Sequence, residues 1–281
     1  MQVMVTGSAG KIGREAVKAL RAAGHSVTGL DLRGGMVDGV RTLACDCADF
    51  GEVIGAFSGV DTMARPDAIV HLAGIPMPGL KPDATIFATN TVSTYNVFSA
   101  AARLGIKRIA WGSSETILGL PFPTPPAFAP LDESHPDRPE WSYSLTKKLG
   151  EEMADQFVRW HPEMTIVSLR FSNVFDAADY IQRPATASKP AIRKVNMWGY
   201  VDARDAGEAC RLAIEADLTG HHRMIIAAAD TVVDVPSAAL MAEFYPGVPL
   251  RSTVEGYSSL LSTANAERLI GYRPQHSWRD Q

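Results

Sequence analysis

The sequence is poor in several features that define whole classes of protein. Its 281 residues include only three cysteines, and the formal net charge is −4. No apolar run approaches the roughly 18 residues that cross a bilayer, and no signal-peptide pattern opens the chain. Three cysteines make no disulfide framework, and the charge balance gives no reason to expect nucleic acid. We therefore expect a cytoplasmic protein without a nucleic-acid or membrane partner.

Residues that could bind a metal are also few. Cys45 and Cys47 flank Asp46, and His221 is followed directly by His222. Two ligands without a second cluster do not close a tetrahedral site, and adjacent side chains on a strand point to opposite faces. We expect no metal, with the cysteines semi-buried at a strand end and the histidines at the surface or at the start of a strand.

Short apolar runs alternate with helical patterns along most of the chain. The predicted strands are 2–6, 26–31, 40–45, 68–73, 108–112, 165–171 and 223–228. The predicted helices are 11–23, 50–57, 84–104, 140–160, 203–216, 237–244 and 262–269. Strands that are apolar almost throughout, alternating with helices, indicate an α/β fold whose parallel sheet is covered on both faces.

A glycine-rich turn joins the first predicted strand to the first predicted helix. Its glycines follow the spacing G-x-x-G-x-x-G. Glycine lets the backbone approach a pyrophosphate closely, and the helix N-terminus offers free amides to the phosphates. The turn residues predicted to bind a dinucleotide are Gly7, Ala9, Gly10, Lys11, Ile12 and Gly13.

Asp31 ends the next predicted strand and is followed by Leu32 and Arg33. A carboxylate at this point accepts hydrogen bonds from the adenosine ribose and repels a 2′-phosphate, which favours NAD over NADP. Arg33 partly offsets that repulsion. We expect NAD as the cofactor, with Asp31 and Leu32 among its contacts and NADP as the less favoured alternative.

A tyrosine and a lysine stand four residues apart in the predicted helix 140–160. Tyr143 and Lys147 therefore share one face, where the ammonium lowers the phenol pKa and suits it to acid–base work. Ser113 and Ser114 follow the predicted strand 108–112, at the sheet edge where α/β folds bind ligands. Together these residues predict a reaction centre.

With these motifs the chain resembles the extended short-chain dehydrogenases/reductases, the NAD-dependent epimerase/dehydratase family. Further matching segments, in family order, are CDCAD (45–49), VHLAG (70–74), TYNVFSAA (94–101), KRIAWGSSETILG (107–119), RFSNVF (170–175), YVDARDAGEA (200–209) and RLIGYRPQHSW (268–278).

The resemblance implies a role for each matching residue. Tyr143 would be the acid–base residue, Lys147 would lower its pKa and hold the nicotinamide ribose, and Ser114 would orient the reacting oxygen. Further cofactor contacts would come from Asp46, Cys47, Leu72, Ala73, Gly74 and Asn90. Substrate contacts would come from Ser113, Ser114, Asn173 and Arg183. The alternative for Arg183 is a solvated loop arginine.

The resemblance also implies the architecture. The family fold is a Rossmann-type doubly wound parallel sheet with a small interleaved C-terminal substrate lobe. We expect the NAD-binding domain at 1–172 and 200–229 and the lobe at 173–199 and 230–281. A homodimer would form through helices 84–104 and 140–160.

The implied function is oxidation of a CH–OH group of a small polar sugar or sugar-acid-like substrate, as in uronate dehydrogenases. The alternative is a sugar-nucleotide epimerase or dehydratase with the same Ser-Tyr-Lys triad and tightly bound NAD. Leu118, where family epimerases usually carry tyrosine, and the short stretch after Asn173 favour the first. A third hypothesis is a non-catalytic NAD-binding regulator, and the complete triad counts against it.

Overall fold

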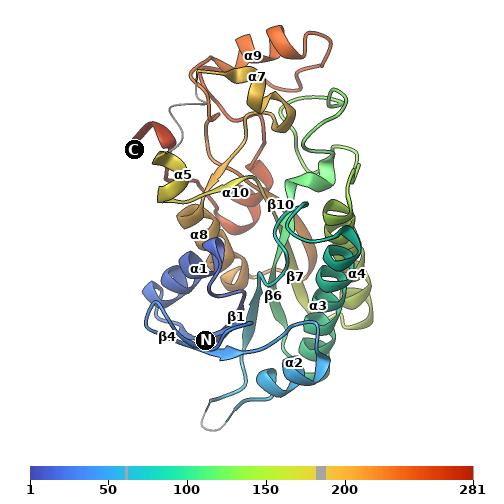
Figure 1. Ribbon diagram of the computed structural model, residues 1–281, viewed down its shortest axis with the longest axis vertical. Helices are drawn as coiled ribbons and strands as arrows, with labels where there is room; N and C mark the ends of the chain where they lie inside the picture. Colours follow the sequence, from blue (N-terminus) through green and yellow to red (C-terminus); the bar gives the residue numbers. More distant parts are fainter. Residues whose placement is uncertain (61–62, 182–187, 281) are drawn as a thin grey trace.

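The computed structural model describes residues 1–60, 63–181 and 188–280. Its main sheet has the strand order β10-β7-β6-β5-β1-β2-β4-β3 (Figure 1). The strands are β1 (Gln2–Thr6), β2 (Ser26–Asp31), β3 (Gly35–Val37), β4 (Val40–Ala44), β5 (Ala68–His71), β6 (Arg108–Ser114), β7 (Thr165–Phe171) and β10 (Gly220–Ile226). Every neighbouring pair is parallel except β3 with β4. The order reverses between β1 and β5, and α/β folds bind ligands at such a switch point.

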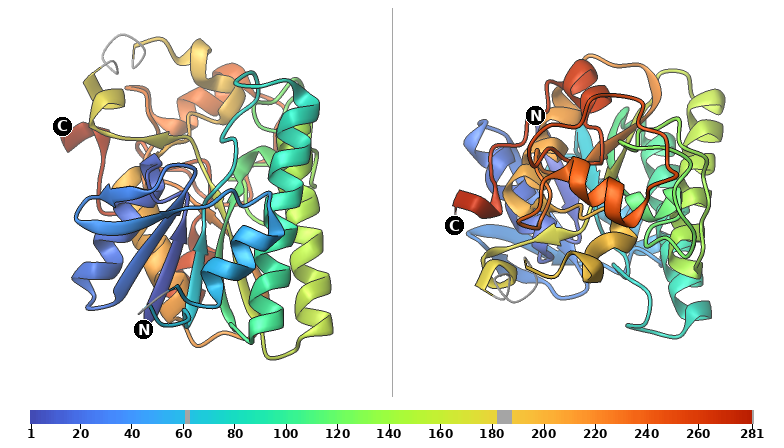
Figure 2. Two further views of the ribbon diagram at one scale, coloured as in Figure 1. Left: turned by 60° about the horizontal axis from the view of Figure 1, so that its bottom comes forward. Right: turned by 90° about the horizontal axis from the view of Figure 1, so that it is seen from above.

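Helices cover both faces of this sheet (Figure 2). One face carries α1 (Lys11–Ala22) and α8 (Ala203–Glu215), and the other carries α2 (Phe50–Phe57), α3 (Asp83–Leu104) and α4 (Ser142–Trp160). Alternation along β1 explains the two layers, since Val3 and Val5 join the core under α1 while Met4 joins the core under α3. The doubly wound fold class is confirmed.

Smaller elements lie above the carboxyl edge of the sheet (Figure 1). They are β8 (Val174–Phe175) paired with β9 (Val201–Asp202), the helices α5 (Ala177–Ile181), α7 (Pro190–Arg193) and α9 (Ser237–Phe244), and the 3-10 helices η1 (Glu115–Leu118), η2 (Lys194–Asn196) and η3 (Trp278–Asp280). Helix α10 (Ala264–Ile270) instead packs beside β10, where Asn265 Nδ2 donates to Arg223 O at 2.8 Å, and its Ala266 and Ile270 join the core under α1 and α8. A separate apolar core unites Phe122 and Leu131 of the proline-rich segment with Trp198 and Leu261. The division into two domains stays a prediction.

Most predicted bounds agree with the structure, and the differences have local causes. Strand β3 was not predicted because three residues beginning with glycine carry almost no periodic signal. The predicted strand 223–228 begins earlier, at Gly220.

His221 lies at the start of strand β10, one of its two predicted places, and not at the surface. Its side chain is only 2% exposed, and its ring nitrogens bond to Ser168 Oγ at 2.7 Å and Asp155 Oδ1 at 2.8 Å. Cys45 and Cys47 are fully rather than partly buried, and both thiols are free.

Within the described ranges, no helix combines the length and apolarity needed to span a bilayer. The same ranges contain no group of three or more His, Cys, Asp or Glu side chains arranged to hold a metal ion.

Candidate active site

The turn between β1 and α1 is built for close approach of a ligand. A Cβ at Gly13 would lie 2.1 Å from Gly7 O, and one at Gly7, whose φ is +68°, would lie 2.8 Å from Ala73 N. Helix α1 is preceded by Gly10, which has no side chain to cap the first-turn amides. Those amides and the positive end of the helix dipole therefore fit the pyrophosphate of a dinucleotide.

Asp31, at the end of β2, is tied to this turn. Its Oδ2 accepts a hydrogen bond from Ala9 N at 3.0 Å, and its Oδ1 accepts one from Leu32 N at 2.9 Å. The side chain of Leu32 is exposed. Asp46, which follows β4, is also exposed, and its Oδ1 accepts from Ala48 N at 2.9 Å. The Asp31 carboxylate is thus fixed beside the phosphate turn, where ribose hydroxyls can reach it.

The segment after β5 is held by Thr6. Thr6 Oγ1 accepts from Leu72 N at 3.2 Å and Ala73 N at 3.1 Å, so its own proton points to His71 Nδ1 at 2.7 Å. Burial lowers the pKa of His71 to about 3, which keeps the ring neutral. The backbone from His71 to Ala73 is therefore fixed beside the glycine turn.

Asn90, in the middle of α3, continues this support. Its Oδ1 accepts from Ile75 N at 2.7 Å, and its Nδ2 donates to Ile75 O at 3.0 Å. The side chain of Asn96 likewise donates to Cys47 O at 3.1 Å. Both polar atoms of the Asn90 amide thus bind the loop that follows Gly74, and Asn90 shapes the predicted cofactor site through that loop.

The three predicted catalytic side chains come together at the carboxyl edge. Ser114 ends β6, and its Oγ accepts from Thr116 N and Thr116 Oγ1 at 3.2 and 3.0 Å. Tyr143 lies in the first turn of α4, and Ser114 is near enough to its phenol to lower the phenol pKa. Lys147 Nζ donates to Gly112 O at 2.6 Å and lies 5.7 Å from the Tyr143 ring centroid.

The acid–base balance of the chain alone differs from the prediction. Burial raises the pKa of Tyr143 to about 12, although the nearby Ser114 hydroxyl lowers it. Burial also lowers the pKa of Lys147 to about 8. Desolvation therefore outweighs the expected effect of the ammonium on the phenol, and the phenol is protonated near neutral pH.

The predicted substrate contacts are placed differently. Ser113 Oγ donates to the buried Glu151 Oε1 at 2.7 Å, so this hydroxyl binds α4, and the geometry does not support a substrate contact. Asn173 is exposed, and its carbonyl accepts from Val201 N at 3.0 Å. Arg183 lies outside the described residues.

The comparisons with known proteins decide the family. A model of the NAD-dependent epimerase/dehydratase family matches residues 3–227. The chain belongs to this family. It is thus an NAD(P)-dependent enzyme of the short-chain dehydrogenase/reductase type, as predicted.

Individual relatives agree with this family assignment. The chain is 28% identical over 283 residues to an L-arabinose 1-dehydrogenase (NAD(P)(+)) of Haloferax volcanii, with 98% of this chain and 96% of the relative covered. It is 29% identical to a uronate dehydrogenase of Pseudomonas syringae, over 62% of this chain and 60% of the relative. A short-chain dehydrogenase/reductase superfamily protein of Agrobacterium tumefaciens, solved with bound NAD, superposes with a TM-score of 0.73 at 24% identity, covering 99% and 94% of the two chains.

The sequence alone predicts no role for three residues near the triad, each of which has a buried polar atom. They are Glu115, Ser172 and Arg193. Glu115 follows Ser114 directly, and that adjacency was the one available signal. Ser172 and Arg193 reach the site only through tertiary folding.

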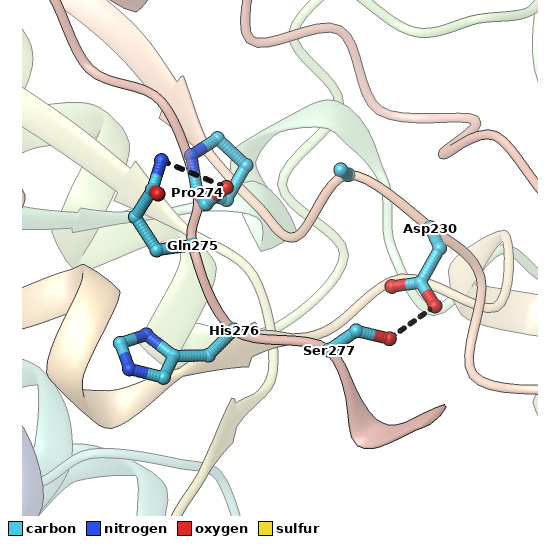
Figure 3. Close-up of a pocket in the computed structure, with 6 residues that line it drawn as sticks. Asp230, Pro274, Gln275, His276 and Ser277 are labelled. Carbon is cyan, nitrogen blue, oxygen red and sulfur yellow. Dashed lines mark hydrogen bonds between the residues drawn. The ribbon is translucent and has the colours of Figure 1, made fainter. Parts of the chain in front are cut away.

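A small open pocket elsewhere is not part of this site. It lies at the C-terminal segment, where Ser277 Oγ donates to Asp230 Oδ2 at 2.7 Å (Figure 3). His276, which also lines it, bonds through Nδ1 to Asp205 Oδ1 at 2.7 Å. Since these polar groups bind one another, we assign no ligand to the pocket.

Proposed function

We propose that this protein is an NAD-dependent dehydrogenase that oxidises a CH–OH group of a small sugar or sugar-like substrate. The observation that carries the proposal is the convergence of Ser114, Tyr143 and Lys147 at the carboxyl edge of the sheet, the same edge at which the glycine turn follows β1. The activities of the two sequence relatives, on L-arabinose and on uronate, support a substrate of this size.

The triad suits the chemistry of this reaction. In the proposal, Ser114 Oγ and the Tyr143 phenol hydrogen-bond the reacting hydroxyl, and the tyrosine takes its proton. Bound NAD supplies the hydride acceptor and, when oxidised, a positive charge that lowers the phenol pKa. Lys147, held by Gly112 O, stabilises the phenolate. Burial of both the serine and the tyrosine excludes water from the proton transfer.

The test is the variant Tyr143→Phe, assayed by NADH formation with free sugars. Loss of the acid–base group should lower kcat by about 10²- to 10⁴-fold while NAD binding is retained. Tyr95→Phe, which removes the hydroxyl of an exposed tyrosine on α3, should keep wild-type turnover. Unchanged turnover of Tyr143→Phe would contradict the proposal. Interconversion of UDP-sugars without net NADH would favour the epimerase alternative.

We also propose a homodimer through α3 and α4. Both helices present exposed apolar side chains, among them Val92 and Tyr95 on α3 and Leu145 and Trp160 on α4. Exposed large apolar side chains on two packed helices are a feature that a subunit interface would bury. Tyr95→Glu should shift the mass measured by analytical ultracentrifugation from dimer to monomer, and a monomeric wild type would refute this interface.

A cytoplasmic location remains a prediction. Three buried free thiols support it, since cysteines in oxidising compartments usually pair. Fractionation of the native host would test it, and recovery outside the cytoplasm would refute it.

A further inference from the structure

Two buried polar side chains and a half-buried arginine, from distant segments, meet next to Ser114. Glu115 begins η1, Ser172 follows β7, and Arg193 ends α7. The register of the sheet pairs Ser114 with Phe171, so the next residues, Glu115 and Ser172, leave neighbouring strands side by side. Gly199 links Ser172 to Arg193, because a Cβ at Gly199 would lie 2.9 Å from Ser172 Oγ and Arg193 Nη2 donates to Gly199 O at 3.0 Å. The charges of Glu115 and Arg193 also act on each other. The charge of Glu115 also reaches the Tyr143 phenol. The cluster therefore adjoins the proposed reacting centre.

Each member of this cluster has a buried polar atom that is not hydrogen-bonded. In the part of the chain that the structure describes, Glu115 Oε2, Ser172 Oγ and Arg193 Nε have no partner. Glu115 is 6% exposed and Ser172 is 3% exposed. Native proteins pair nearly all buried polar groups, because an unpaired one is costly. Three such atoms in one place indicate a ligand that supplies their partners.

Arg193 is oriented by contacts that do not use this nitrogen. Its Nη2 donates to Gly199 O at 3.0 Å, and its guanidinium lies 5.6 Å from the centroid of the Phe175 ring. The guanidinium is thus held in place while Nε stays available. A positioned donor is what a substrate-binding group requires.

Burial raises the pKa of Glu115 to about 7, so at pH 8 and above the cluster carries two charges, and these distinguish between substrates. A hydroxyl both donates and accepts, so one sugar hydroxyl can donate to Glu115 Oε2 and accept from Arg193 Nε. An ionised carboxylate only accepts, so it could bond Arg193 but would lie against the Glu115 carboxylate. Like charges in a desolvated site repel strongly.

We propose that Glu115, Ser172 and Arg193 form the specificity subsite of this enzyme and that it selects a neutral sugar over a sugar acid. The inference rests on the proposed sugar dehydrogenase function. Glu115 neutralises the arginine and accepts the sugar hydroxyl. Arg193 and Ser172 complete the hydrogen bonds.

The experiment compares matched substrates that differ only in charge. NADH formation is measured for galactose against galacturonate and for glucose against glucuronate. The wild type should show a kcat/KM at least tenfold higher for the neutral member of the pair it uses better. Glu115→Gln, which keeps the size and removes the charge, should lower that ratio at least tenfold, mainly through a lower KM for the uronate.

Glu133→Gln is the matched control. Glu133 is also a partly buried carboxylate, but its Oε1 already accepts from Ile225 N at 2.7 Å. Its substrate ratio should equal that of the wild type. Melting temperatures of both variants establish that they are folded.

The outcomes separate this inference from the proposed function. A wild type that prefers the uronate overturns the inference whatever the variants do, while the dehydrogenase function stands. The inference is also overturned if Glu115→Gln has the same kcat/KM ratio of neutral sugar to uronate as the wild type. If no free sugar reduces NAD and UDP-galactose is converted to UDP-glucose, the proposed function fails and the subsite inference fails with it.

Discussion

Gly150, in the middle of α4, connects core packing to the geometry of the active site. An added Cβ there would lie 2.2 Å from Cη2 and 2.5 Å from Cζ2 of Trp111, a β6 side chain that is 1% exposed. An ordinary van der Waals contact needs about 3.4 Å or more, so the helix and the ring must separate by about 1 Å. The same helix carries Tyr143 and Lys147, and Lys147 Nζ lies 5.2 Å from the Trp111 ring centroid.

Two opposing effects set the size of the change in Gly150→Ala. Helix propensity alone favours alanine by about 1 kcal/mol. Overpacking of a rigid core costs about 1–3 kcal/mol, and overlap with two atoms of a buried indole belongs at the upper end. We expect a net loss of about 2 kcal/mol in the free energy of unfolding. A shift of about 1 Å in the proton-transfer geometry should also lower kcat by about 10- to 100-fold.

Gly55→Ala is the matched control, because Gly55 is an exposed position inside α2 where an added Cβ meets no atom within 4 Å. There the propensity effect acts alone and should stabilise the protein by about 0.5–1 kcal/mol. Denaturant unfolding and steady-state NADH formation measure both variants. If Gly150→Ala is as stable and as active as Gly55→Ala, the packing argument is refuted.

Two further predictions concern charges in the site. Asp31→Asn keeps the size and one acceptor oxygen, which can still accept from Ala9 N, but loses the bond from Leu32 N and the charge. It should raise the kcat/KM ratio of NADP to NAD by about tenfold, and an unchanged ratio would contradict the ribose assignment. Burial lowers the pKa of Lys147 from 10.5 to about 8. The buried ammonium therefore destabilises the folded state by its full amount below pH 8, and this destabilisation decreases to zero as the pH rises to 10.5. Lys147→Met should therefore raise the free energy of unfolding by about 1–2 kcal/mol below pH 8, after allowing for the lost bond to Gly112 O, with the gain vanishing toward pH 10.5. A gain that is constant with pH would show that the buried charge is not its source.

Local features of the chain were predictable from the sequence. The bounds 50–57, 165–171 and 237–244 agree with α2, β7 and α9, since periodicity and neighbouring residues determine such elements. Likewise, the glycine spacing predicts the phosphate turn, and the four-residue interval from Tyr143 to Lys147 predicts a shared helix face. These motifs act over a few residues, so the sequence carries them directly.

Burial and long-range contacts were decided by the tertiary structure. Ser113 binds Glu151 in the middle of α4, while Ser114, the last residue of β6, faces Tyr143 in the first turn of the same helix. Only the packing of α4 against the sheet determines which of its residues each serine faces. Desolvation, which sets the pKa of Tyr143 to about 12, depends on how much of the fold covers the phenol.

The sequence by itself therefore determined the fold class, the family and the local parts of the cofactor and catalytic motifs. Only the tertiary structure brought Arg193 and Ser172 to Glu115, because these three residues lie in segments far apart along the chain. Short-range spacing is encoded in backbone geometry, whereas the meeting of distant side chains depends on how every element between them packs.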